Sequence, residues 1–322
     1  MALLPFLIAP VLAATPQVDS VPEEFATIQL AIDNGKSSII EVGPGRWAGA
    51  RVTRPVVIHG APGAKITMGA DPRVVNSPLG IGFALDERAS GTEIEGFTFA
   101  CSASKSLDVG VYSSFSRLGS VADDVRVANN TFVGCFQGVT NAGRSTTTCR
   151  PKAVTGGEYW LVEDNTFDGI RSTAHNGTTG GGIGVFLFNA QNVDVLENDF
   201  VGAVQDRRDF TTGGVVVAGC RDCAIVGNDF AVTGATGWWA SISNMGYYQQ
   251  GAAATERLYV ADNDATTDSA ANLDINFRSL DSYDVDFVHN QGVTFIDHSW
   301  CGDKRVETFD SSGGTSPTSA RR

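Results

Sequence analysis

The sequence has little positive charge. Its 322 residues include 23 lysines and arginines against 36 aspartates and glutamates, which gives a formal net charge of −13 at pH 7. Such a surface repels the phosphates of nucleic acids and the anionic headgroups of membranes, so we expect neither as a partner. Lysine is especially scarce, and arginine supplies most of the positive charge. An anionic ligand therefore needs a local arginine patch, because the overall field opposes it.

The sequence also lacks an apolar run long enough to span a membrane. The N-terminal stretch "MALLPFLIAPVLAATP" holds about a dozen apolar residues and ends in small ones, which is typical of a signal peptide. We predict a signal peptide over residues 1–14, cleaved after Ala13 or Ala14, although the usual positively charged start is missing. A buried N-terminal strand or cap is the alternative. The prediction makes the protein secreted, either extracellular or periplasmic.

The six cysteines offer no metal-binding pattern. The Cys220–Cys223 pair has no second CxxC and no nearby pair of histidines, which disfavours zinc. An even cysteine count in a secreted chain favours disulfides. Cys135 and Cys149 are close enough in sequence for a local bridge, but spacing does not fix the connectivity. We predict no metal-ligating residues and no certain cofactor, with Ca²⁺ as the candidate.

Glycine, in contrast, is abundant, with 37 residues, while charged residues make up only 18% of the chain. This composition is typical of many tight turns and few exposed helices. One short amphipathic helix is predicted in "VPEEFATIQLAIDNG" (residues 21–35), where apolar residues fall at helical spacing, glutamates occupy the first turn and Asn-Gly ends the segment. Brief β runs punctuated by glycine and proline follow it.

From about residue 92 the chain repeats one unit. Segments such as "VRVANNTF", "LVEDNTF" and "VDVLENDF" are apolar alternations that end on asparagine, usually followed by threonine or aspartate and then phenylalanine. The shared asparagines recur 27 to 35 residues apart, at Asn130, Asn165, Asn198, Asn228, Asn263 and Asn290. Nothing between the units looks helical, and a β-only solenoid with short turns is a parallel β-helix.

The asparagine of each unit has a structural and a functional interpretation. If the coils stack in register, equivalent asparagines lie about 4.8 Å apart and their amides hydrogen-bond along the stack. Asparagine also tolerates the left-handed conformation that a turn between sheets needs, and the phenylalanine two residues on would stack inside the coil. The functional alternative is a metal ladder of asparagine and aspartate. We favour scaffolding, because a ligand site is needed once and this triple recurs in every unit.

The segments "FATIQLAIDNG" and "IIEVGPGRW" resemble the N-terminal cap and first coil of right-handed parallel β-helix proteins of the pectin-lyase-like superfamily, and the V-x-x-N-x-F units resemble its asparagine turn. The resemblance covers most of residues 23–300. It implies an all-β, single-stranded right-handed parallel β-helix (a solenoid) over residues 15–308 with a short N-terminal capping helix. Residues 309–322 are predicted to be a disordered tail.

The resemblance does not imply one activity, because the superfamily includes lyases, hydrolases, epimerases and non-catalytic surface proteins. The paired aspartates, Gly-His-Gly and Arg-x-Lys of its hydrolases are absent, as is the Asp-Pro-His-Asp of alginate epimerases.

One outer face of the predicted solenoid carries candidate binding residues. The first β runs of successive coils are "GIGVFLFN", "GGVVVAG", "WASISNM" and "ANLDINFR", beginning at residues 182, 213, 239 and 271. Side chains alternate along a strand, so Val185 and Leu187 should point inward. The residues predicted to point outward are Phe186, Phe188, Val216, Ser241, Ser243, Asp274 and Asn276, with Arg278 further on.

The long insertions precede these same runs. Insertions at the same position in successive coils of a solenoid stack along one side of it. They bring together His175, Asp206, Arg207, Arg208, Asp209, Trp238 and Trp239. Tryptophan faces stack on sugar rings, arginines hold carboxylates, and aspartates transfer protons or bind calcium. The alternatives are a solvated loop with internal ion pairs at residues 206–209 and tryptophans that anchor their loop.

We therefore predict a groove for an extended, acidic polysaccharide that the protein binds and, as a lyase or hydrolase, cleaves. The predicted catalytic residues are Asp206, Arg207, Arg208, Asp209 and Asp274. The predicted substrate-binding residues are His175, Phe186, Phe188, Trp238, Trp239, Asn276 and Arg278. The alternative is a non-catalytic surface or adhesion module, so the sequence leaves open whether the protein is an enzyme. We expect a monomer.

Overall fold

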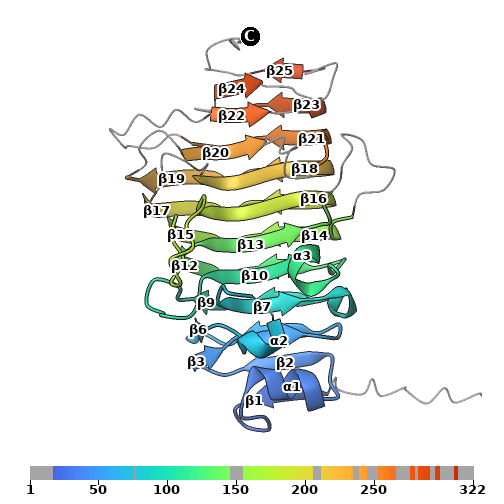
Figure 1. Cartoon of the computed structure of the whole chain (residues 1–322), viewed down its shortest axis with the longest axis vertical. Coiled ribbons are helices and arrows are strands. Elements are labelled where there is room, and N and C mark those ends of the chain that lie inside the picture. Colours follow the sequence, from blue (N-terminus) through green and yellow to red (C-terminus); the bar gives the residue numbers. More distant parts are fainter. Residues whose placement is uncertain are drawn as a thin grey trace, which may run out of the picture.

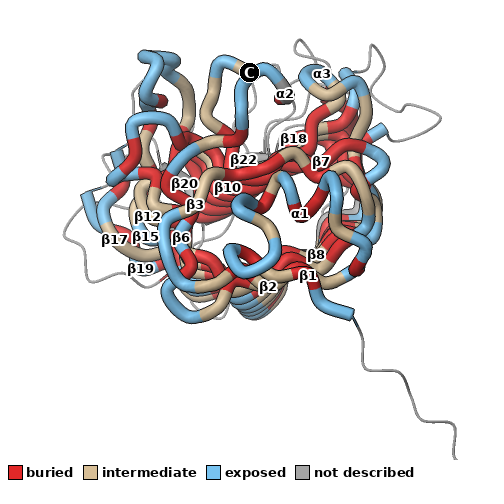
Figure 2. Tube along the Cα trace, turned by 90° about the horizontal axis from the view of Figure 1, so that it is seen from below, coloured by how far each residue is buried: buried red, intermediate tan, exposed pale blue. Residues whose placement is uncertain are grey.

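The chain winds into a stack of coils (Figure 1). The computed structural model describes residues 17–75, 77–145, 155–205, 212–234, 239–244, 252–265, 276–279, 282–290, 294–297 and 308–310. Every pairing between the named strands of these segments is parallel. The sequence prediction of an all-β, right-handed parallel β-helix is confirmed. Buried residues line the inside of the coil and exposed ones lie mostly at the turns (Figure 2).

Each coil contributes strands to three faces. Face A contains β4 (Ala50–Val52), β7 (Ile81–Leu85), β10 (Val109–Ser114), β13 (Gln137–Ala142), the first parts of β16 (Ile183–Leu196) and β18 (Thr212–Val226), and β20 (Trp239–Asn244). Face B contains β1 (Val18–Val21), β2 (Ile39–Val42), β5 (Val57–Gly60), β8 (Glu93–Glu95), β11 (Arg126–Ala128), β14 (Glu158–Glu163), the second parts of β16 and β18, β21 (Thr255–Ala261), β23 (Ser282–Val288) and β25 (Thr308–Asp310). Face C contains β3 (Gly45–Ala48), β6 (Ala64–Met68), β9 (Thr98–Phe99), β12 (Thr131–Cys135), β15 (Thr166–Arg171), β17 (Asp199–Gln205) and β19 (Asp229–Thr233). A separate pair, β22 (Asn276–Ser279) and β24 (Thr294–Asp297), lies near the C-terminal end.

The predicted N-terminal helix caps the first coil. Helix α1 (Ile28–Asn34) begins after Thr27, whose side-chain oxygen accepts a hydrogen bond from the Leu30 N–H at 3.1 Å. Its Ile28 and Ile32 are buried against the first strands. The glutamates predicted for the first turn precede the helix instead, and Glu24 accepts a hydrogen bond from the Ser20 N–H.

The remaining helices are single turns between strands: α2 (Pro72–Val75), the 3₁₀ helix η1 (Glu87–Ala89) and α3 (Phe115–Leu118). The prediction that nothing helical interrupts the repeating units is therefore wrong at α3. This turn lies between β10 and β11, and its C-terminal Gly119 takes a left-handed φ of 80°.

The asparagine ladder is present at every predicted position. Asn198 shows the pattern: its Nδ2 donates to the Oδ1 of Asn228 at 2.9 Å and to the backbone carbonyls of Val162 and Leu196. Its own Oδ1 accepts from the backbone N–H and the Nδ2 of Asn165, both at 3.0 Å. The same side-chain bond joins each successive pair from Asn130 to Asn290. The ladder thus replaces sheet hydrogen bonds at the corner between faces B and C.

The asparagines do not themselves take the left-handed turn conformation, contrary to our expectation. The residue before each one does, with φ between 52° and 68°: Asn129, Asp164, Glu197, Gly227, Asp262 and His289. The ladder amide therefore holds the corner by hydrogen bonds, while its exposed neighbour supplies the change of direction.

A column of phenylalanines fills the coil; four of them follow a ladder asparagine by two residues, and Phe99 continues the column on the preceding coil. Phe99, Phe132, Phe167, Phe200 and Phe230 form a parallel stack with ring centroids 4.6 to 4.9 Å apart. A glycine on face A lies against each ring. A Cβ added to Gly184 would lie 2.5 Å from a Phe200 ring carbon and 2.6 Å from the Gly214 carbonyl oxygen, so this position needs glycine. One small and one large residue per coil give the core its shape.

Two disulfides are present among the described residues. Cys101 pairs with Cys135, with Cα atoms 4.9 Å apart, and Cys220 pairs with Cys223. The suggested bridge between Cys135 and Cys149 is therefore wrong. The sequence separation of 34 between Cys101 and Cys135 matches the repeat length, so the two cysteines lie above one another on neighbouring coils.

Candidate functional site

A hollow lies where face C turns into face A. We call it the edge hollow; it has a volume of about 560 Å³. Three loops surround it, residues 69–80, 100–108 and 172–182, and each leads from a face C strand into a face A strand. Its polar lining includes Asp71, Lys105, Asp108, His175 and Asn176. The hollow therefore lies beside the loops that precede the face A strands, which is the position in each coil where the sequence predicted functional loops.

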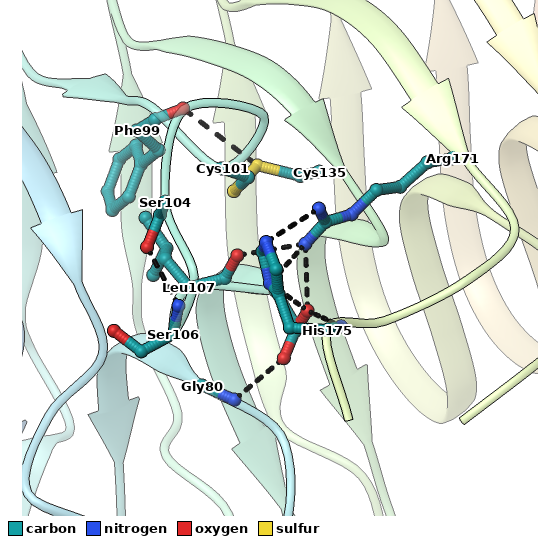
Figure 3. The surroundings of a disulfide bond; sticks show 10 residues. Gly80, Phe99, Cys101, Ser104, Ser106, Leu107, Cys135, Arg171 and His175 are labelled. Carbon is teal, nitrogen blue, oxygen red and sulfur yellow. Dashed lines mark hydrogen bonds and ion pairs between the residues drawn. A yellow bond between two sulfur atoms is a disulfide. The ribbon is translucent and has the colours of Figure 1, made fainter. Parts of the chain in front are cut away.

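Asp108 holds the three loops together. Its side chain is only 2% exposed. One carboxylate oxygen accepts from the backbone N–H of Gly80 at 3.0 Å. The other accepts from the backbone N–H of His175 at 2.8 Å and from Nη2 of Arg171 at 2.7 Å. The imidazole Nδ1 of His175 lies 2.8 Å from the same oxygen (Figure 3). Asp108 is thus fully engaged as an acceptor, which suits a buried carboxylate.

Arg171 supplies the positive charge that this buried carboxylate needs. Its side chain is 14% exposed, and Nη2 also donates to the carbonyl of Leu107 at 2.9 Å. Burial lowers the pKa of the Arg171 guanidinium, and the charge of Asp108 acts in the opposite direction. The guanidinium also contacts both ring nitrogens of His175 at 2.9 and 3.1 Å. Arg171 therefore fixes the imidazole at the rim of the hollow, where its side chain is 22% exposed.

A short turn makes room for this arrangement. Only Phe136 separates β12 from β13, so no long loop occupies that coil at the edge. Loop 172–182 folds across it, and Asn176 Nδ2 donates to the carbonyl of Pro78 at 2.9 Å. The Cys101–Cys135 disulfide anchors the start of loop 100–108 to the end of β12 beside the Arg171–His175 pair (Figure 3). Loops of two neighbouring coils and of the next coil but one thereby meet around one hollow.

The outer side of face A differs from the prediction. Near β7 and β10 it is covered by an apolar cluster made of Ala70, Val75, Ile81, Ala84, Val109 and Tyr112. Phe186 and Phe188 are half-buried and point outward, with ring centroids 6.1 Å apart. Val216, Ser241 and Ser243, predicted as exposed outward positions, are buried. The strand alternation was predicted correctly, but it does not show what covers a face.

Several predicted site residues lie outside the described residues: Asp206, Arg207, Arg208, Asp209, Trp238 and Asp274. Trp239 contributes its backbone to β20, and Asn276 and Arg278 contribute theirs to β22. Of the predicted set, the structure brings His175 to the edge hollow and places Phe186 and Phe188 on face A. The grouping of the predicted catalytic residues stays a prediction.

Sequence reasoning missed Asp108, Arg171 and Lys105. Loops 69–80 and 100–108 precede β7 and β10 just as loop 172–182 precedes β16, so applying the argument about loop position to them would have included Lys105 and Asp108. Among the described residues, no group of three or more His, Cys, Asp or Glu side chains could hold a metal ion. No helix in the described segments is long and apolar enough to cross a membrane.

Comparisons with known proteins support the fold. No family model and no curated protein sequence matches the chain. Among solved structures, Escherichia coli YbhC aligns with a TM-score of 0.50 at 14% identity, covering 88% of this chain and 78% of YbhC. The chain has the parallel β-helix fold. A pectin methylesterase from Aspergillus niger aligns with this β-helix at 12% identity, with a TM-score of 0.46 and coverage of 96% and 92%. An alginate lyase from Paenibacillus aligns at 13% identity, with a TM-score of 0.42 and coverage of 86% and 93%.

The edge hollow of this β-helix has the chemistry of a binding site. Lys105 is a donor at its rim, Asn176 adds an amide, and His175 lines it with both ring nitrogens already engaged by Arg171 and Asp108. Asp71 also lines it; hydrogen bonds from Arg73 lower the pKa of this carboxyl to about 2, so it is ionised at neutral pH. Lys105 makes no ion pair with any described residue, so its charge is available to a ligand.

Proposed function

We propose that this protein is secreted and binds an extended, acidic polysaccharide at the edge hollow. The observation that carries the proposal is the meeting of three loops, tied by Asp108, around a hollow of about 560 Å³ on one edge of the coil. An oligosaccharide offers hydroxyls to Asn176 and Asp71, its ring can pack beside the His175 imidazole, and a uronate carboxylate suits Lys105. An open edge parallel to the coil axis suits a chain rather than a compact ligand.

The described hollow favours binding over cleavage. Glycoside hydrolysis needs one protonated carboxyl group and a second carboxylate near it. Asp108 is committed to its loop partners, and Asp71 is ionised beside Arg73. A catalytic group would therefore come from the predicted set at residues 206–209 and 274. Cleavage is the second candidate function, and a non-catalytic surface module is its alternative.

Binding is tested by calorimetric titration with polygalacturonate and alginate, beside a neutral glucan of similar length. We expect binding of the acidic chains only. Replacing Lys105 and His175 together by alanine should weaken it at least about tenfold, equivalent to about 1.4 kcal/mol. Lys36→Ala is the matched control, because it removes one exposed positive charge at the N-terminal cap. Equal affinity of the double variant and the control would contradict the assignment of the edge hollow.

Cleavage is tested separately by incubating the protein with the same polyuronates, with and without Ca²⁺, and following both unsaturated products and new reducing ends. Release of either product assigns the lyase or hydrolase function. Binding without product under all conditions assigns the surface-module alternative instead.

Secretion and the monomeric state are parts of the same proposal. The two disulfides fit an oxidising compartment. Thiol titration of the denatured protein, purified from its native host without reductant, should find these four cysteines unreactive. Sedimentation at several concentrations should give the mass of one chain, and a larger species would contradict the monomer.

A further inference from the structure

A column of outward-facing residues runs along face C and changes charge from one end to the other. Strand register places the members beside one another on successive coils. From the N-terminal end they are Arg46, Lys65, Thr98, Thr131, Thr166, Asp199, Asp229 and Asp264. Five of its last six members directly precede a phenylalanine of the core stack. The sixth, Asp264, directly follows the ladder asparagine Asn263. Threonine and aspartate therefore do not alternate along the stack: the column is cationic, then hydroxylic, then acidic.

The cationic end is unusual for this protein. Arg46 and Lys65 are Cα partners on neighbouring parallel strands, both exposed, so their like charges point to the same side. Neither makes an ion pair or a hydrogen bond with any described residue. The arginines that do form ion pairs with carboxylates are Arg51, Arg54, Arg73, Arg88, Arg126, Arg171, Arg221 and Arg257. Acidic partners are plentiful in a chain of net charge −13, so two adjacent cations without one stand out.

These two cations border a second hollow, of about 330 Å³. Its other lining residues are small or neutral: Gly45, Gly63, Thr67, Ala100 and Ala103. No carboxylate lines it, so the positive potential inside it is not cancelled locally. The glycines and alanines leave room for a ligand to approach both cations.

We propose that this cationic hollow binds an oxyanion group, the carboxylate or sulfate of an acidic polysaccharide, as a second subsite for the ligand of the edge hollow. This inference rests on the proposed function. Strand β6 connects the two hollows, because Lys65 lines one and Met68 the other, about 10 Å apart along the strand. Loop 100–108 lies between them, with Ala103 on one hollow and Lys105 on the other. One extended anionic chain can therefore occupy both, and the second contact raises its affinity by effective concentration.

The test compares the wild-type protein with the Arg46→Ala/Lys65→Ala double variant in titrations with a long polygalacturonate oligomer, a sulfated glycan and inorganic sulfate. Both side chains are exposed, so the variant should fold, and its melting temperature should not fall, since a repulsion is removed. We expect the acidic chains to bind the variant about tenfold more weakly and with a shallower salt dependence. Lys36→Ala should bind like the wild type.

The outcomes separate the two proposals. Wild-type affinity in the double variant, together with a loss in the Lys105→Ala/His175→Ala variant, would overturn the second subsite and leave the proposed function intact. No binding of any acidic chain to the wild-type protein would contradict the proposed function itself. Binding of inorganic sulfate as tight as that of the chains, and lost in the double variant, would show a free-anion site and overturn the polysaccharide assignment.

Discussion

The asparagine ladder inside the coil and the loops at its edge are both held by hydrogen bonds between residues far apart in sequence, but they are built differently. Ladder partners are 27 to 35 residues apart and every coil repeats the same bond. At the edge, Asp108 joins Arg171 and His175, 63 and 67 residues away, and the arrangement occurs once among the described residues. The repeated bonds account for the architecture, whereas the single cluster shapes a hollow.

The largest effect is expected inside the ladder. Replacing Asn198 by alanine removes its side-chain donors and acceptor and takes hydrogen bonds from buried groups on two neighbouring coils, among them the backbone N–H of Asn165. Each unsatisfied buried group costs about 1–3 kcal/mol, so the variant should lose about 3 kcal/mol or more. Urea denaturation measures the loss. Asn34→Ala, which removes one exposed bond at the end of α1, should change little; equal losses in the two variants would contradict the ladder's role.

The next effect is expected at the edge. Asp108→Asn keeps the shape of the side chain but leaves the buried Arg171 without a counter-charge. Breaking a buried pair in this way costs about 3–5 kcal/mol, and we expect the loss to be local. Hydrogen exchange should rise in loops 69–80, 100–108 and 172–182 while the ladder strands keep their protection. The exposed Asp71→Asn is the control; faster exchange throughout the coil in Asp108→Asn would show that the edge and the interior are one unit.

The smallest effect is expected on face C. Burial, and then the charges of Asp264 and Asp199, raise the pKa of Asp229. A raised carboxyl pKa in the folded state means that stability is greatest below the unfolded-state pKa and decreases as the pH rises through the folded-state value. Asp229→Asn should therefore raise the melting temperature at pH 7, by at most about 2 °C. The difference should vanish below about pH 4.

The control for this prediction is Asp168→Asn on the same face, because its register partners Val133 and Val201 are neutral. It should not change the melting temperature. A stabilisation by Asp229→Asn that persists at low pH would show that charge is not its cause.

The sequence predicted the interior well because the same residue pattern recurs wherever the same buried position recurs from coil to coil. The Asn-x-Phe spacing gave the coil phase, the inward direction of Val185 and Leu187, and the phenylalanine stack. It did not predict that the residue before each asparagine takes the left-handed turn, because aspartate, glutamate, glycine, histidine and asparagine all occur there. The pattern of Gly184 against Phe200 was readable only once the coils were stacked.

The edge was less predictable because its contacts depend on how loops of different length fold over one another. Asp108 meets His175 only because the turn at Phe136 is short enough for loop 172–182 to cross it. Alternation along β18 showed that Val216 points away from the core but not that it is covered. Cys135 was assigned to a cysteine near it in sequence, whereas its partner lies one coil away.

The most direct test of the account is hydrogen exchange of the wild-type protein with and without a saturating acidic oligosaccharide. If the coil is scaffold and the edge is the binding site, protection should increase in loops 100–108 and 172–182 and at the adjoining β6, with face B and the ladder asparagines unchanged. Protection confined to face B, or no change in the edge loops when the ligand is bound, would contradict the assignment of function to the edge.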